Sequence, residues 1–154
     1  MGSTSRPAGA TSAPNSSKQY YSTASPFEAQ IGYCRAVRHA QQISVSGTTA
    51  VDPQSPATAP QILFPDDARQ QTRVALAECI NAVKGLGGKG PESVVRVRMF
   101  VSRHEDCAAV GEGFREVLGR NGAGVGTAAT MVVVSGFVDE RMRVEVEMDG
   151  IADG

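Results

Sequence analysis

Two groups of polar side chains have the types and spacing needed for ligand binding or acid–base chemistry. Tyr33 and Arg35 lie two residues apart in an alternating stretch, so both are expected on one face of a strand. There the phenol could hydrogen-bond a ligand, and the guanidinium could hold a carboxylate through two N–H groups. Arg143, Glu145 and Glu147 alternate in the same way near the C-terminal end. Both groups also have a plainer interpretation, in which the side chains reach water from a solvated sheet surface.

Other motifs predict no further chemistry. The run Gly85–Gly90 fits the letters of a dinucleotide-binding loop, but it closes a helix instead of opening one. His39 and His104 have no partner at a metal-ligand spacing, and no G-x-S-x-G nucleophile motif is present. The cysteines are odd in number and far apart, which predicts three free thiols: Cys34, Cys79 and Cys107. We therefore expect neither a metal nor a cofactor.

Composition excludes several classes of partner. The formal net charge of the 154 residues is −1, whereas nucleic-acid binding usually leaves a basic surface. Tryptophan is absent and aromatic residues make up 5%, so platforms for stacked bases are not expected either. No apolar run approaches the roughly 18–20 residues that span a bilayer. Without a signal-peptide pattern at the N-terminus, we expect a cytoplasmic protein, with a mitochondrial location left open.

The chain divides into a tail and one domain. Residues 1–25 are rich in Ser, Thr, Ala, Pro and Gly and have almost no large apolar side chain before Tyr20. Such a segment buries too little surface to offset its ordering entropy, so it is expected to be a flexible tail that becomes ordered near Tyr21. Residues 26–150 are expected to form a single domain.

Hydrophobic periodicity predicts five strands and two helices in that domain. Period-two alternation predicts strands over 31–38, 42–47, 94–101, 130–137 and 142–148. Spacing of three and four residues predicts helices over 66–86 and, after a capping-box pattern at 102–105, up to 118. A turn is expected at 39–41, and four prolines indicate a loop over 52–65.

This order of elements indicates an α+β fold in which both helices cover one face of a mixed sheet. The other face then has no layer to cover it. The predicted strand 130–137 is nevertheless apolar on both of its faces, because Met131 and Val133 alternate with Val132 and Val134. A strand of that kind is usually buried on both sides. We therefore expect an oligomer whose subunits bury their open sheet faces against each other.

These pieces together resemble the reactive-intermediate deaminase family, also called YjgF or L-PSP-type. The resemblance spans residues 26–148, and its matching segments are 32–37, 45–49, 52–53, 71–76, 93–101 and 144–147. It implies a chorismate-mutase-like fold and a homotrimer with a central barrel, with small-molecule sites in the clefts between subunits. Family members of this type hydrolyse imines and enamines to keto acids and ammonia, without a metal or cofactor.

The resemblance also assigns roles to particular residues. The family's site tyrosine falls on Tyr33, the serine and glycine of its turn fall on Ser46 and Gly47, and the glutamate that positions the attacking water falls on Glu145. Tyr33, Ser46 and Glu145 are the implied catalytic residues. The substrate-binding residues that we expect beside them are Arg35, Gly47, Ala129, Thr130 and Met131.

The sequence departs from the family at one position. An arginine of the family's Pro-Ala-Arg-Ser motif holds the substrate carboxylate, and Ala129 stands in its place. A charge-assisted contact of that kind contributes roughly 1.5–3 kcal/mol, so a small imino acid should bind about ten- to a hundredfold more weakly. Either Arg35 supplies the cation from another strand, or the pocket accepts a substrate that has no carboxylate.

Three functions follow as hypotheses. The first is hydrolysis or tautomerisation of an imine or enamine in the intersubunit cleft. The second is a trimer of the same fold that binds small metabolites or proteins without turnover, which the loss of the arginine favours. The third is ribonuclease activity, a label also attached to the family; the acidic net charge, the few aromatic residues and the lack of paired histidines argue against it.

Overall fold

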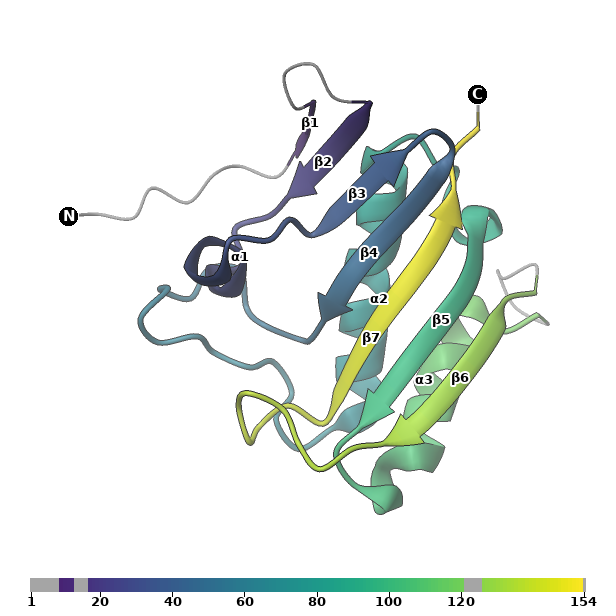
Figure 1. The fold of residues 1–154 in the computed structure, drawn as a ribbon. Helices are drawn as coiled ribbons and strands as arrows, with labels where there is room; N and C mark the ends of the chain where they lie inside the picture. Colours follow the sequence, from purple (N-terminus) through teal and green to yellow (C-terminus); the bar gives the residue numbers. More distant parts are fainter. Residues whose placement is uncertain (1–8, 13–16, 121–125, 154) are drawn as a thin grey trace.

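The computed structural model describes residues 9–12, 17–120 and 126–153. In this part of the chain, one mixed sheet of seven strands carries two long helices on one face (Figure 1). The strands are β1 (Gly9–Ser12), β2 (Lys18–Ser22), β3 (Ala36–His39), β4 (Gln42–Thr48), β5 (Val94–Val101), β6 (Ala128–Val133) and β7 (Val144–Ile151). The helices are α1 (Pro26–Ile31), α2 (Ala68–Gly85) and α3 (Cys107–Leu118), with single 3-10 turns η1 (Pro91–Ser93) and η2 (His104–Asp106).

The sheet has the strand order β1-β2-β3-β4-β7-β5-β6. All neighbouring strands pair antiparallel except β5 and β6, which are parallel and are connected through α3. The expected α+β fold, with a mixed sheet covered by two helices on one face, is therefore confirmed (Figure 1).

The core lies between the sheet and the two long helices. Strand β7 shows how the sequence places it there: Val144, Val146 and Met148 are fully buried against the helices. The residues between them, Glu145, Glu147 and Asp149, are half-buried on the other face, as the period of two requires. On that face Arg98 Nη1 lies 3.2 Å from Asp149 and 3.6 Å from Glu147. The uncovered face of the sheet is thus charged along β7 and at Arg98 on the neighbouring β5.

The two long helices agree with the prediction. Asp67 caps α2, because its side chain accepts a hydrogen bond from the Gln70 N–H at 3.0 Å. Helix α3 ends at Gly119, as expected, but its start differs. The 3-10 turn η2 precedes it, and the Ser102 hydroxyl donates to the Arg143 carbonyl at 3.4 Å instead of capping the helix.

The first predicted strand, 31–38, is wrong in its first half. Residues 26–31 form the short helix α1, which begins at Pro26 and ends at Gly32. Gly32 has a φ of 93°, a left-handed conformation that favours glycine, and its N–H binds the Glu28 carbonyl at 2.8 Å. The strand β3 starts only at Ala36. The hairpin around residues 39–41 and the second strand are confirmed.

The N-terminal segment also differs from the expected tail. Strands β1 and β2 lie within it, and β2 pairs with β3 along the edge of the sheet. Tyr21 packs against the core, where a side chain at Gly85 would meet its ring at 2.3 Å. A mainly polar segment can form this strand because the free edge of β3 offers backbone hydrogen bonds. The rest of the expected tail, residues 1–8 and 13–16, lies outside the described residues.

The predicted strand over 130–137 is shorter and less buried than expected. Strand β6 ends at Val133 and forms an edge of the described sheet. Met131 packs against the core, but Val132 and Val133 are 42% and 49% exposed. Burial of this strand on both faces is therefore absent within one chain. The oligomer that would complete it stays a prediction.

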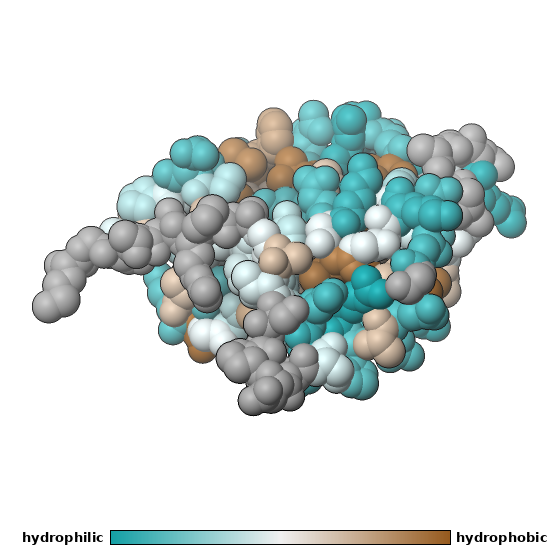
Figure 2. Space-filling model, turned by 90° about the horizontal axis from the view of Figure 1, so that it is seen from above, coloured by the Kyte–Doolittle hydropathy of each residue, from teal (hydrophilic) through white to brown (hydrophobic). Residues whose placement is uncertain are grey.

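Figure 2 shows the end of the molecule that lies at the top of Figure 1. In the view from above Figure 1, hydrophilic and near-neutral residues dominate, and hydrophobic ones appear in small separate patches (Figure 2). No helix in the described segments is long and apolar enough to cross a membrane.

All three cysteines are free thiols, as predicted, and burial raises the pKa of the Cys79 thiol to about 12.

Candidate functional site

Arg35 is the centre of the candidate site. It precedes β3 and is buried, being only 3% exposed. Its Nη1 donates to the Gly47 carbonyl at 2.8 Å and to the Thr48 hydroxyl at 2.9 Å. Its Nη2 contacts the Glu28 carboxylate at 3.3 Å and the Tyr33 hydroxyl at 3.4 Å. One guanidinium therefore ties α1 and the segment before β3 to the end of β4.

Tyr33 and Gly47, both predicted site residues, meet at this arginine. The Tyr33 ring lies beside the guanidinium, with its centroid 5.5 Å from Arg35 Cζ. Tyr33, Arg35 and Gly47 line a cavity of about 20 Å³ together with Phe27, Thr49 and Glu78; this cavity is called the chamber below. Beside it lies a groove of about 750 Å³ between residues 22–34 and the loop 53–58, and Tyr33 lines both.

Glu145 lies against Gly47 on the uncovered face of the sheet. A Cβ built on Gly47 would lie 2.1 Å from Glu145 Oε1, so only glycine leaves room for this carboxylate. Burial raises the pKa of the Glu145 carboxyl; the Arg35 charge opposes this increase and Glu147 adds to it. Gly47 also lines the chamber, so this residue lies next to both the chamber and Glu145.

Ser46 is engaged in holding the backbone together. Its hydroxyl donates to the Cys34 carbonyl at 2.7 Å, and its N–H donates to the Arg35 carbonyl at 2.8 Å. These bonds fasten β4 to the segment that carries Tyr33 and Arg35. The catalytic role expected for Ser46 stays a prediction.

One chain does not bring the remaining predicted residues to the chamber. Ala129, Thr130 and Met131 lie on β6, with β5 between them and β7. Ala129 pairs with Val97, whereas Glu145 pairs with Phe100, three residues further along β5. Thr130 is exposed, and Met131 packs toward the core beside α3. Their expected place at the rim of the site requires a second copy of the chain.

Sequence reasoning missed two carboxylates of this region, Glu28 and Glu78. Glu28 is 6% exposed and forms the ion pair with Arg35. Glu78 projects from α2 into the chamber lining, where burial raises the pKa of its carboxyl, Arg35 opposes the increase and Glu28 adds to it. Neither has a local sequence signal, because the charged neighbours of each lie on other elements. Among the described residues, no group of three His, Cys, Asp or Glu side chains is placed to hold a metal.

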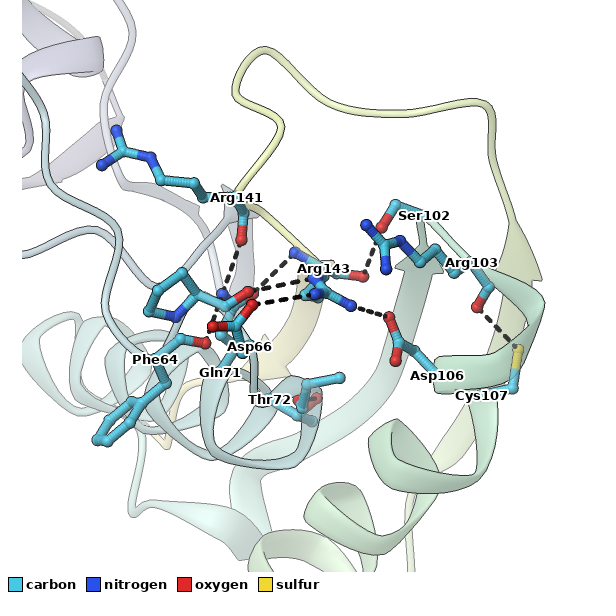
Figure 3. Close-up of polar contacts among 12 residues, drawn as sticks. Phe64, Asp66, Gln71, Thr72, Ser102, Arg103, Asp106, Cys107, Arg141 and Arg143 are labelled. Atoms are coloured by element: carbon cyan, nitrogen blue, oxygen red, sulfur yellow. Dashed lines mark hydrogen bonds and ion pairs between the residues drawn. The ribbon is translucent and has the colours of Figure 1, made fainter.

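Arg143, which the sequence placed on the same face as Glu145, has a different role. It lies just before β7, where its guanidinium contacts Asp106 at 3.1 Å and Asp66 at 3.4 Å, and its Nε donates to the Pro65 carbonyl at 3.1 Å (Figure 3). These contacts join the loop before α2 to the start of β7. They position the strand that carries Glu145 and lie apart from the chamber.

The fold and this site define an α+β protein with a helix-covered mixed sheet and a small polar chamber at the end of β4. The sequence model described as endoribonuclease L-PSP matches residues 23–152, and the chain belongs to this family.

Three proteins show how far the similarity extends. An uncharacterized protein of Streptomyces coelicolor is 33% identical over 125 residues, which cover 81% of this chain and 85% of the relative. The crystal structure of Rv2704 from Mycobacterium tuberculosis, a member of the YjgF/YER057c/UK114 family, is 30% identical with a TM-score of 0.71, and covers 88% of this chain and 100% of Rv2704. Escherichia coli TdcF, crystallised with bound serine, shares the fold at 19% identity and a TM-score of 0.67, over 79% of this chain and 88% of TdcF.

Proposed function

We propose that the protein hydrolyses a reactive imine or enamine that carries no carboxylate next to its C=N bond, in a cleft between the subunits of a homotrimer. The reaction type comes from the resemblance to imine- and enamine-hydrolysing members of the family. The observation that carries the choice of substrate is the set of contacts made by Arg35. Its two terminal nitrogens already bind four protein oxygens.

A carboxylate grip by arginine uses two parallel N–H groups. To form one, Arg35 would have to release the Glu28 carboxylate, and both side chains of this pair are more than nine-tenths buried. Breaking a buried ion pair is costly because it leaves an uncompensated charge. Arg35 is therefore poorly placed to replace the arginine that the family has at Ala129. Its expected role in substrate binding is limited to the one nitrogen that has no partner, Nε.

The charge around the chamber favours the same conclusion. Glu28 offsets the charge of Arg35, while Glu78 and Glu145 add two further carboxylates within electrostatic range of that guanidinium. An anionic substrate would be repelled here, whereas a neutral imine or a cationic iminium would not. Tyr33, whose oxygen faces Arg35 Nη2, keeps its own hydroxyl hydrogen for donation to the substrate. Glu145 would orient or deprotonate water, as the resemblance implies.

Imines generated in situ test this proposal. An amine oxidase acting on simple amines supplies imines without a carboxylate, and an amino-acid oxidase supplies the matching imino acids. Semicarbazide competes for both, so faster hydrolysis appears as less semicarbazone. We expect at least tenfold greater acceleration for the amine-derived imines. Acceleration of imino acids alone would overturn the choice of substrate, and no acceleration of any imine would overturn the enzymatic function.

The second candidate function is a trimer that binds a small metabolite without turnover. The observation that favours it is Ala129, a methyl group where the family's carboxylate-binding arginine stands. A thermal shift by amines or imine analogues, with no hydrolysis of any imine, would support this function. Light scattering that shows a monomer would exclude the intersubunit cleft for both candidates.

Replacing Gly47 with alanine should reduce activity far more than stability. The new methyl group would overlap Glu145 Oε1, so the carboxylate has to swing away from the chamber. Because the overlap involves the end of a flexible side chain, we expect a melting temperature close to that of the wild type and a drop in kcat/KM of tenfold or more. The variant Ser44→Ala, at an exposed position on the same strand, is the control. Equal activity of Gly47→Ala and the wild type would contradict the placement of Glu145.

A further inference from the structure

The chamber contains a buried donor that the protein itself does not satisfy. The Arg35 side chain is 4% exposed, and its Nε finds no hydrogen-bond acceptor among the described residues. Native proteins rarely leave such a group without a partner. Arg35 is one of the residues that line the chamber.

An unpaired acceptor lines the same chamber. Glu78 is half-buried on α2, and its carboxylate forms no hydrogen bond or ion pair with the residues that the structure describes. The chamber volume of about 20 Å³ suffices for one water molecule, which needs roughly 10–15 Å³ and two or more polar partners. Arg35, which has the unpaired donor, and Glu78, which has the unpaired acceptor, both line this space. A bound water needs partners of these two kinds.

We propose that the chamber is the water site of the hydrolysis, and that Glu78 is the base that takes the proton from the attacking water; this rests on the proposed function. The water accepts a hydrogen bond from Arg35 Nε and donates one to the Glu78 carboxylate. As its oxygen forms a bond to the imine carbon, the C=N π pair moves to nitrogen and one water proton moves to Glu78. That proton then passes to the nitrogen, which gives a carbinolamine. Glu78 next takes the proton of the carbinolamine hydroxyl and delivers it to the nitrogen, so that the C=O bond forms, the C–N bond breaks and ammonia leaves. No oxidant or reductant is involved.

The surroundings of Glu78 suit a base. Burial raises the pKa of its carboxyl, against the opposing charge of Arg35, which makes it a stronger base than an ordinary glutamate. The charged and titratable groups that face it are Arg35, Glu28 on α1, and Tyr33 across the chamber. The resemblance gives the water to Glu145, but Glu145 is not among the residues that line the chamber, whereas Glu78 is. The proton transfer is therefore reassigned from Glu145 to Glu78.

Replacing Glu78 with glutamine removes the base without changing the shape of the side chain. On the oxidase-generated imine that the wild type hydrolyses fastest, we expect kcat to fall about a hundredfold, while KM changes less than threefold. Glu112→Gln, the same change at an exposed position of α3, should leave kcat unchanged. The variant should remain folded: a carboxyl whose pKa is raised on folding destabilises the native state once it is ionised, so at pH 8 Glu78→Gln should melt at or above the wild-type temperature.

Two readouts separate a base from a merely structural residue. Added formate should restore part of the activity of Glu78→Ala, because it can occupy the vacated space and accept the proton. A high-resolution crystal structure of the wild type should show an ordered water within hydrogen-bond distance of Arg35 Nε and Glu78. An active wild type with kcat in Glu78→Gln within threefold of it, or a chamber without that water, would overturn this inference alone. A wild type inactive on every imine would overturn the proposed function, and the proton-transfer role with it.

Discussion

Replacing Glu28 with leucine should lower the free energy of unfolding by about 3–5 kcal/mol, because it leaves the Arg35 charge buried without its partner. The two charged groups lie 3.3 Å apart, with side chains only 4% and 6% exposed. Glu28 also accepts hydrogen bonds from the N–H and the hydroxyl of Thr23, so it joins the segment after β2 to α1. Urea unfolding of the purified variants measures the loss.

A double variant distinguishes charge from packing. Glu28→Leu combined with Arg35→Met removes both charges, and apolar replacement of a whole buried pair is often neutral. We expect the double variant to recover much of the stability that Glu28→Leu loses. Glu116→Gln, which breaks the partly exposed pair with Arg69, should leave the unfolding midpoint nearly unchanged. If the double variant were no more stable than Glu28→Leu, the stabilisation by Glu28 would not come from its charge pairing with Arg35.

The ion pair of Glu28 and Arg35 also links the stability of the fold to the proposed function. Arg35 Nη1 holds the Gly47 carbonyl at 2.8 Å, and Gly47 is the residue against which Glu145 lies. Loss of Glu28 would therefore disturb the chamber before it unfolds the protein. For this reason we expect the activity of Glu28→Gln, which keeps the side-chain shape, to fall at temperatures well below its melting temperature.

The elements that the sequence predicted well are those whose burial has a simple period. Helix α2 and strands β4, β5 and β7 pack one face on a common core, so the spacing of their apolar residues follows directly from geometry. Strand β2 has no such pattern, because it gains its hydrogen bonds from the edge of β3 and buries little beyond Tyr21. Helix α1 was missed because it has only six residues, from Pro26 to Ile31.

The candidate site was predictable only in part, for a related reason. Tyr33 and Glu145 were named from the alternation of side chains and again through the family resemblance, and Gly47 through the resemblance alone. The structure brings Tyr33 and Gly47 together at Arg35, with Glu145 against Gly47. The partners that set the charge there, Glu28 and Glu78, come from two other elements. No local pattern encodes such contacts, since the distance along the chain between the charged groups is unrelated to the period of a helix or strand.

Gln71 is the residue outside the site whose replacement should have the largest effect. It is fully buried on α2 and satisfies three backbone groups at once (Figure 3). Its Nε2 donates to the carbonyls of Phe64 at 3.0 Å and Arg141 at 2.9 Å, and its Oε1 accepts from the Arg143 N–H at 2.8 Å. Each unsatisfied buried group costs about 1–3 kcal/mol, so Gln71→Leu should destabilise the protein by about 3 kcal/mol or more.

The three backbone groups that Gln71 binds belong to the loop before α2 and to the segment that leads into β7. Losing these hydrogen bonds should therefore change local dynamics and activity as well as stability. Phe64 adopts a φ of 49°, an uncommon conformation for a bulky residue, and its carbonyl is one of the two that Gln71 binds. Arg143 immediately precedes β7, the strand that carries Glu145. Gln71→Leu should therefore speed hydrogen exchange at the Arg143 amide and reduce activity even where the protein stays folded. Gln71→Glu, which keeps the acceptor and loses both donors, should restore protection of that amide while remaining unstable.

Gln70→Leu is the matched control, because within the described part of the chain the Gln70 side chain has a single hydrogen bond, accepted from Arg73 at 3.4 Å on the surface. Its unfolding midpoint and its Arg143 exchange rate should match those of the wild type. If Gln70→Leu and Gln71→Leu lost equal stability, the effect would belong to helix α2 in general. In that case the Gln71 side-chain amide would not hold the loop before α2 against the start of β7. The position of Glu145 would depend instead on the ion pairs of Arg143.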